Sequence, residues 1–115
     1  MAYTEIDNPK LYHETLLYTG TGADVNIGGL QFQPDWVWIK RRASGNAHGG
    51  MFDSVRGVTK LISSSQSDGE QTIASSLKSF RSDGFSLGSG DSGYVNQNSG
   101  KTYVAWNWKA GTSFT

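Results

Sequence analysis

The chain has 115 residues, with ten basic and ten acidic side chains, four tryptophans, 15 glycines and no cysteine. A chain of this length forms one domain, and the absence of cysteine excludes disulfides, thiolate catalysis and cysteine-based zinc sites. The formal net charge of zero gives no reason to expect nucleic acid as a partner, and no apolar run approaches the roughly 20 residues of a membrane helix.

Residues 1–14 are predicted to form an N-terminal arm, ahead of a single β-sandwich domain over residues 15–115. Pro9 occupies a position where a helix can begin, which predicts one helical turn in the arm. Because one turn is not stable alone, the arm is expected to pack on this domain or on a neighbouring molecule. Its apolar anchors are Ile6, Leu11 and Tyr12.

Eight short strands are predicted after the arm, at the roughly 8–12-residue spacing typical of a sandwich or small barrel. Each run is rich in β-branched or aromatic residues and is bounded by turn-forming residues. The clearest hairpin signal is Ser82-Asp83-Gly84. The expected fold is all-β, a compact, jelly-roll-like antiparallel β-sandwich. The predicted strands are 15–19, 24–27, 34–41, a short strand that runs into a turn within 51–57, 59–63, 76–80, 84–87 and 101–109.

All four tryptophans lie in two of these strands, as Trp36-Val37-Trp38 and Trp106-Asn107-Trp108. Strand side chains alternate between faces, so each strand places both indoles on one face. Such rings can fill a core or a subunit interface, where tryptophan concentrates, or they can form a platform for sugar rings. Packing is the favoured interpretation, and the pattern does not decide between core and interface.

No pattern in the chain predicts an enzyme. There is no Ser-His-Asp set, no pair of carboxylates in a cleft-forming context and no phosphate loop. The histidines lack the spacing of zinc ligands, and scattered Asp-Gly pairs are typical of turns rather than of a calcium site. Asp53 and Arg56 are interpreted as a structural pair around a turn, with a polar ligand site as the alternative. We therefore expect no catalytic residue, metal or cofactor.

Five segments in a fixed order carry a family resemblance. They are Leu-Tyr-Thr-Gly-Thr-Gly (17–22), Phe-Gln-Pro-Asp-Trp-Val-Trp-Ile-Lys (32–40), Phe-Asp-Ser-Val-Arg-Gly-Val-Thr-Lys (52–60), Ser-Asp-Gly-Phe-Ser-Leu-Gly (82–88) and Gly-Lys-Thr-Tyr-Val-Ala-Trp-Asn-Trp-Lys-Ala-Gly (100–111). Together they resemble a module of virion structural proteins from tailed bacteriophages, especially phages of marine bacteria and cyanobacteria. The resemblance covers nearly the whole chain.

The resemblance implies a self-assembling virion subunit of a tail fibre, an appendage or a capsid decoration, put together in the host cytoplasm. It implies docking on other virion proteins and, by analogy, a trimer. Because the chain ends at Thr115, a decoration, knob or fibre-attachment subunit is expected rather than a stand-alone adhesin. The alternative is a carbohydrate-binding module that contacts a host-surface glycan. The candidate interface residues are Ile6, Leu11, Tyr12, Trp36, Trp38, Trp106 and Trp108.

Overall fold

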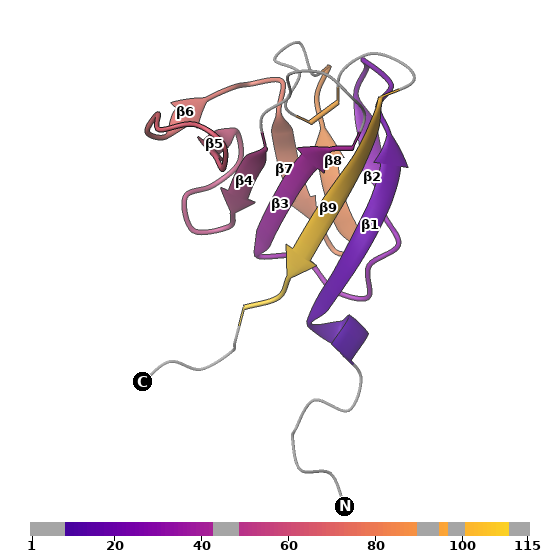
Figure 1. Ribbon diagram of the computed structural model, residues 1–115. Helices are drawn as coiled ribbons and strands as arrows, with labels where there is room; N and C mark the ends of the chain where they lie inside the picture. Colours follow the sequence, from indigo (N-terminus) through magenta and orange to yellow (C-terminus); the bar gives the residue numbers. More distant parts are fainter. Residues whose placement is uncertain (1–8, 43–48, 90–94, 97–100, 111–115) are drawn as a thin grey trace, which may run out of the picture.

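A computed structural model describes residues 9–42, 49–89, 95–96 and 101–110, which form two antiparallel sheets and one 3-10 turn, η1 (Pro9–Leu11). The large sheet has the order β1 (His13–Thr19), β9 (Thr102–Trp108), β3 (Trp36–Arg41), β4 (Gly50–Asp53), β5 (Lys60–Ser63) and β6 (Gln71–Thr72). The small sheet has the order β2 (Val25–Ile27), β8 (Gly84–Leu87) and β7 (Leu77–Arg81). Figure 1 shows the small sheet behind the large one. Within these ranges no helix is long and apolar enough to cross a membrane.

The predicted antiparallel β-sandwich is confirmed, and all eight predicted strands are present. The ninth strand, β6, has only two polar residues and therefore carries no recognisable strand pattern. β1 begins two residues earlier than predicted, because His13 and Glu14 already pair with Trp108 and Asn107. The predicted helical turn of the arm is η1, which ends two residues before β1.

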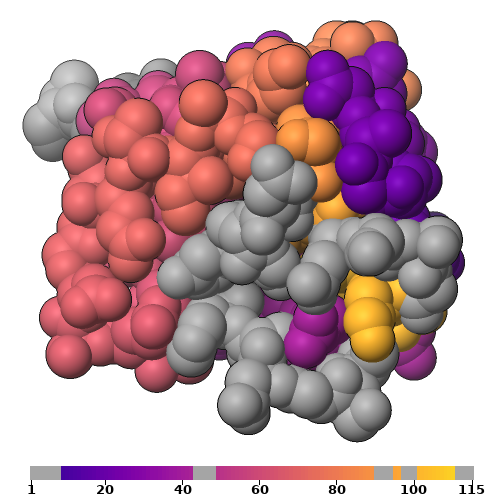
Figure 2. All heavy atoms as spheres, turned by 90° about the horizontal axis from the view of Figure 1, so that it is seen from above, coloured from indigo at the N-terminus to yellow at the C-terminus, as the bar shows by residue number. Residues whose placement is uncertain are grey.

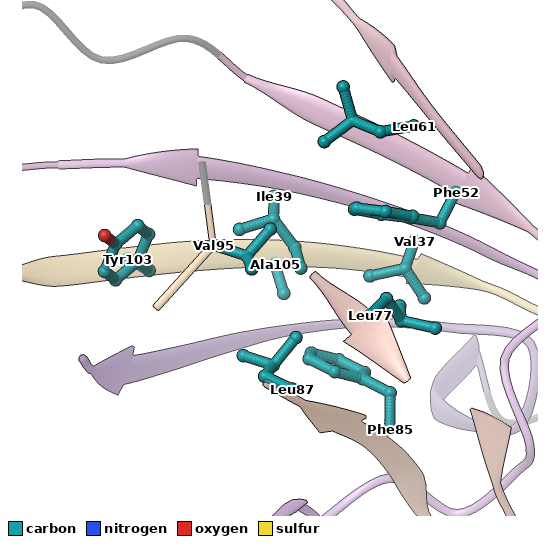
Figure 3. Packing of buried hydrophobic residues seen from close by; sticks show 10 residues of the cluster. All are labelled: Val37, Ile39, Phe52, Leu61, Leu77, Phe85, Leu87, Val95, Tyr103 and Ala105. Carbon is teal, nitrogen blue, oxygen red and sulfur yellow. The ribbon is translucent and has the colours of Figure 1, made fainter. Parts of the chain in front are cut away.

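The hydrophobic core lies between the two sheets. Val37 and Ile39 on β3 alternate with the tryptophans of that strand, and both are fully buried. Side chains of the large sheet meet Leu77, Phe85 and Leu87 of the small sheet in one cluster (Figure 3). Strand alternation therefore directs the aliphatic residues of β3 inward and its two indoles outward. The other members of the cluster are Phe52, Leu61, Val95, Tyr103 and Ala105.

The predicted hairpin joins β7 to β8, with Arg81 opposite Gly84 and a two-residue turn between them. A Cβ atom on Gly84 would lie only 1.9 Å from the backbone oxygen of Ile27. The glycine is thus required because the chain around Ile27 approaches closely, and not because the turn needs a left-handed residue. The missing side chain of Gly84 therefore leaves room for β2 to pair with β8 in the small sheet.

A buried asparagine ties loops together at the upper end of the sandwich. Asn96 accepts a hydrogen bond from the Thr21 N–H (2.7 Å) and donates to the backbone oxygens of Ala23 (2.6 Å) and Gly88 (2.7 Å). Figure 2 looks down on this end, where indigo residues from the start of the chain lie beside the orange residues of the small sheet. Asn96 thereby connects the β1–β2 loop to the end of β8.

Candidate docking surface

All four tryptophans lie on the face of the large sheet that points away from the core. Trp36 pairs with Trp108, and Trp38 pairs with Trp106, across β3 and β9. In Figure 1 this outer face is turned toward the viewer, and no described helix or strand lies over it. The structure therefore places the tryptophans at a surface rather than in the core. We define the outer aromatic face as His13, Trp36, Trp38, Trp106 and Trp108.

Three rings of the outer aromatic face form a continuous stack. The ring centroids of His13 and Trp108 are 4.8 Å apart at an interplanar angle of 26°, and those of Trp108 and Trp36 are 4.3 Å apart at 22°. These separations are close to the roughly 4.8 Å between neighbouring strands. The rings consequently stack along the row that crosses the strands, and both faces of the central ring, Trp108, are covered by its neighbours. Even within the stack, Trp36 is 38% exposed.

A second row lies one step further along the strands. Trp38 and Trp106 are tilted at 47°, with ring centroids 5.0 Å apart, and the Trp38 Nε1–H donates to the Ser64 hydroxyl at 3.1 Å. Met51 and Ile62 continue this row across β4 and β5. The outer face is thus apolar across most of the width of the large sheet.

The described part of the arm adjoins the stacked row. The Lys109 N–H donates to the Tyr12 carbonyl at 2.7 Å, and the Lys109 ammonium lies 5.9 Å from the centroid of the Tyr12 ring. Leu11 and Tyr12 are 40% and 39% exposed. Two of the three predicted anchors therefore lie at the His13 end of the aromatic face, and the third, Ile6, lies outside the described residues.

Asp53 and Arg56 meet in the turn after β4. Asp53 accepts the Arg56 N–H at 2.7 Å and the Arg56 Nε–H at 2.5 Å. The same guanidinium reaches Glu70 at 3.3 Å and the Met51 carbonyl at 3.1 Å. Burial alone would raise the pKa of the Asp53 carboxyl, but the hydrogen bonds and charge of Arg56 outweigh burial and hold that pKa below its usual value. These contacts join the turn to the chain beside β6.

A polar hollow of about 470 Å³ lies on the opposite side of the molecule, on the outer face of the small sheet. Within it Lys78 is paired with Asp24 at 3.1 Å, and the Ser86 hydroxyl donates to Asn26 at 2.7 Å. None of its lining residues is aromatic. The tryptophans and this hollow are therefore on different faces of the sandwich. The lining residues are Asp24, Val25, Asn26, Lys78, Ser79, Ser86 and Leu87.

Titratable residues elsewhere in the described ranges form no metal cluster: no three His, Asp or Glu side chains converge there. Burial raises the pKa of the Tyr18 phenol well above its usual value, and the neighbouring Tyr103 adds to the effect. The Tyr18 hydroxyl donates to the Val95 carbonyl at 2.7 Å. Tyr18 is thus a neutral structural donor inside the sandwich.

Residues 8–115 match a family described as a domain of unknown function (DUF7483). The chain belongs to this family. No curated protein and no solved structure matches it. The family match includes both sheets, η1 and every described residue of the outer aromatic face, so this face lies within the family's own domain.

Proposed function

We propose that the protein is a structural subunit of a tailed-bacteriophage virion, a non-catalytic part of a tail fibre, appendage or capsid decoration. In this proposal it assembles with itself and docks on other virion proteins. The five segments that resemble phage virion modules support the proposal. The observation that carries it is the position of the four tryptophans, which lie on the outer face of the large sheet instead of filling its core.

Tryptophan on a sheet face that none of the described elements covers suits a protein interface. Tryptophan is enriched in the energetic centre of interfaces, where one large ring excludes much water. In this chain the rings are already held in place, since His13, Trp108 and Trp36 stack on one another. A ring that is fixed before binding loses little conformational freedom when a partner covers it. Docking is therefore proposed to bury a preformed apolar row, with Leu11 and Tyr12 at its end.

A carbohydrate-binding module is the alternative. Sugar recognition needs an exposed ring face beside polar groups that bind hydroxyls. Here both faces of Trp108 are covered by His13 and Trp36, Trp38 already donates to Ser64, and the polar hollow lies on the opposite side of the sandwich. This geometry favours a protein partner over a glycan.

The proposal is tested by looking for the protein in purified particles of the phage that encodes it. Antibodies against the purified protein are expected to label one part of the particle in immunogold microscopy. The double variant Trp36→Ala/Trp108→Ala should fold but fail to incorporate. The control Val55→Ala alters a side chain that is 93% exposed in a turn and should incorporate normally.

Two results would overturn the proposal. One is absence of the wild-type protein from particles. The other is saturable binding of wild-type protein to a glycan on an array, lost in the tryptophan variant, which would support the carbohydrate-binding alternative instead.

A further inference from the structure

β1 is an open edge of the large sheet. It pairs with β9 on one side and has no second strand neighbour among the described residues. It is seven residues long, and Leu17 on this strand is 62% exposed. Figure 1 shows β1 at the side of the sheet with no strand beyond it. A long edge strand offers a row of unpaired backbone groups to another strand.

The other three edges carry features that discourage pairing. β6 has two residues and β2 has three. β7 is interrupted by a bulge between Leu77 and Ser79 and carries Lys78 and Arg81. Short strands, bulges and basic side chains are the usual means by which natural sheets block their edges. β1 has no lysine, arginine or proline, and its pairing with β9 is regular over all seven residues.

The backbone groups that β1 leaves free follow from its hydrogen bonds to β9. The Lys109 N–H donates to the Tyr12 carbonyl, and the Gly20 N–H donates to the Lys101 carbonyl. In an antiparallel pair the residues that exchange hydrogen bonds alternate with those that do not. Even-numbered residues of β1 therefore bond to β9. The odd-numbered residues, His13, Thr15, Leu17 and Thr19, point their N–H and C=O groups away from the sheet.

We propose that the occupant of this edge is β1 of a second copy of the chain, paired antiparallel around a two-fold axis at Leu16. In this register Thr15 lies opposite Leu17 of the second copy, and His13 lies opposite Thr19. The four outward residues of each copy then form about eight backbone hydrogen bonds in all. Pairing antiparallel with the same strand closes the contact at two copies, because it uses the edge completely.

The side chains of β1 are complementary in this register. Leu17 packs beside Thr15 of the second copy on the outer face, and Leu16 meets its own equivalent on the inner face. Glu14, the one acidic residue of β1, lies opposite Tyr18 rather than opposite a second carboxylate, so no like charges face each other. The register thus covers the exposed leucine without burying an unfavourable charge pair.

Pairing at β1 joins two large sheets edge to edge. The two-fold axis is perpendicular to the joined sheet, so both outer aromatic faces lie on the same side. The dimer then offers a docking partner two outer aromatic faces in place of one. This inference deepens the proposed function and rests on it for the claim that the chain assembles with itself. The resemblance implied a trimer, whereas pairing at β1 gives a two-fold dimer.

The test is the solution mass of the full chain by light scattering at micromolar concentration. The wild type is expected at twice the 12.5 kDa of one chain. Leu17→Lys adds a charge at the edge, and Thr15→Pro removes an N–H that β9 does not use, so both variants should fold and be monomers. Val55→Lys makes the same kind of apolar-to-lysine change in the exposed turn and should remain a dimer.

Amide hydrogen exchange of the wild type gives a second readout that needs no variant. The amides of Thr15 and Leu17 should be protected, and this protection should fall on dilution. A monomeric or trimeric wild type, a dimer that persists in both edge variants, or fast exchange at both amides in a dimer would overturn the pairing. None of these results decides whether the protein occurs in phage particles, so failure of the pairing and failure of the proposed function are distinguishable.

Discussion

Replacing Trp36 should destabilise the fold much less than replacing a core aromatic residue. Trp36 is 38% exposed and stacks on one ring, Trp108. Trp36→Ala loses that stack, worth about 0.5–1.5 kcal/mol, together with partly covered apolar surface, but it leaves no closed cavity. We expect a total cost of about 1–2 kcal/mol. Phe52, on the neighbouring strand β4, is fully buried, and Phe52→Ala should cost about 3–5 kcal/mol because it leaves a cavity.

The comparison is made by urea unfolding, monitored by far-ultraviolet circular dichroism so that loss of a tryptophan does not alter the signal. All proteins are held at one concentration, because self-association would make the apparent stability depend on it. Equal m-values are required before the free energies of unfolding are compared. If Trp36→Ala costs as much as Phe52→Ala, the indole is part of the core, and a docking role for the outer aromatic face loses its basis.

Three further predictions concern the fold. Gly84→Ala should cost about 1–3 kcal/mol or more, since its Cβ would meet the Ile27 backbone oxygen, whereas Gly69→Ala, with nothing within 4 Å, should be nearly neutral in a thermal melt. Asn96→Ala should cost about 1–3 kcal/mol in urea unfolding, because it leaves buried loop groups without partners. The lowered pKa of Asp53 means that its stabilising contribution is present above about pH 4, the pKa of an unfolded aspartate, and is lost as pH falls through the lower folded value. Asp53→Asn should therefore make the free energy of unfolding depend less on pH under acid conditions, as measured by urea unfolding at a series of pH values. An unchanged pH dependence would contradict this role of Asp53.

Much of the sandwich could be predicted because strand patterns are local. Alternation in Trp36-Val37-Trp38-Ile39 shows that the aliphatic and aromatic side chains occupy opposite faces. It does not show which face the small sheet covers, since both are apolar. That choice depends on contacts between distant segments, here of Val37 and Ile39 with the small sheet. The sequence alone therefore leaves the choice between core and interface open for the tryptophans.

The candidate site was only partly visible for a similar reason. Asp53 and Arg56 are three residues apart, so the sequence predicts that they pair. Glu70, the second acidic partner of Arg56, is 14 residues away from Arg56 in the sequence and is not predicted. The stack of His13 on Trp108 joins residues from the two ends of the domain. Such contacts depend on the order and register of the strands in the sheet. Eight short strands can be arranged in many orders and registers, so the sequence alone does not predict these contacts.

The most direct test of the docking surface is hydroxyl-radical footprinting of the tryptophans by mass spectrometry, on the free protein and on particles that contain it. The edges of Trp36 and Trp108 should be oxidised in the free protein and protected in the particle. Equal oxidation of Trp36 and Trp108 in both states would contradict docking through the outer aromatic face.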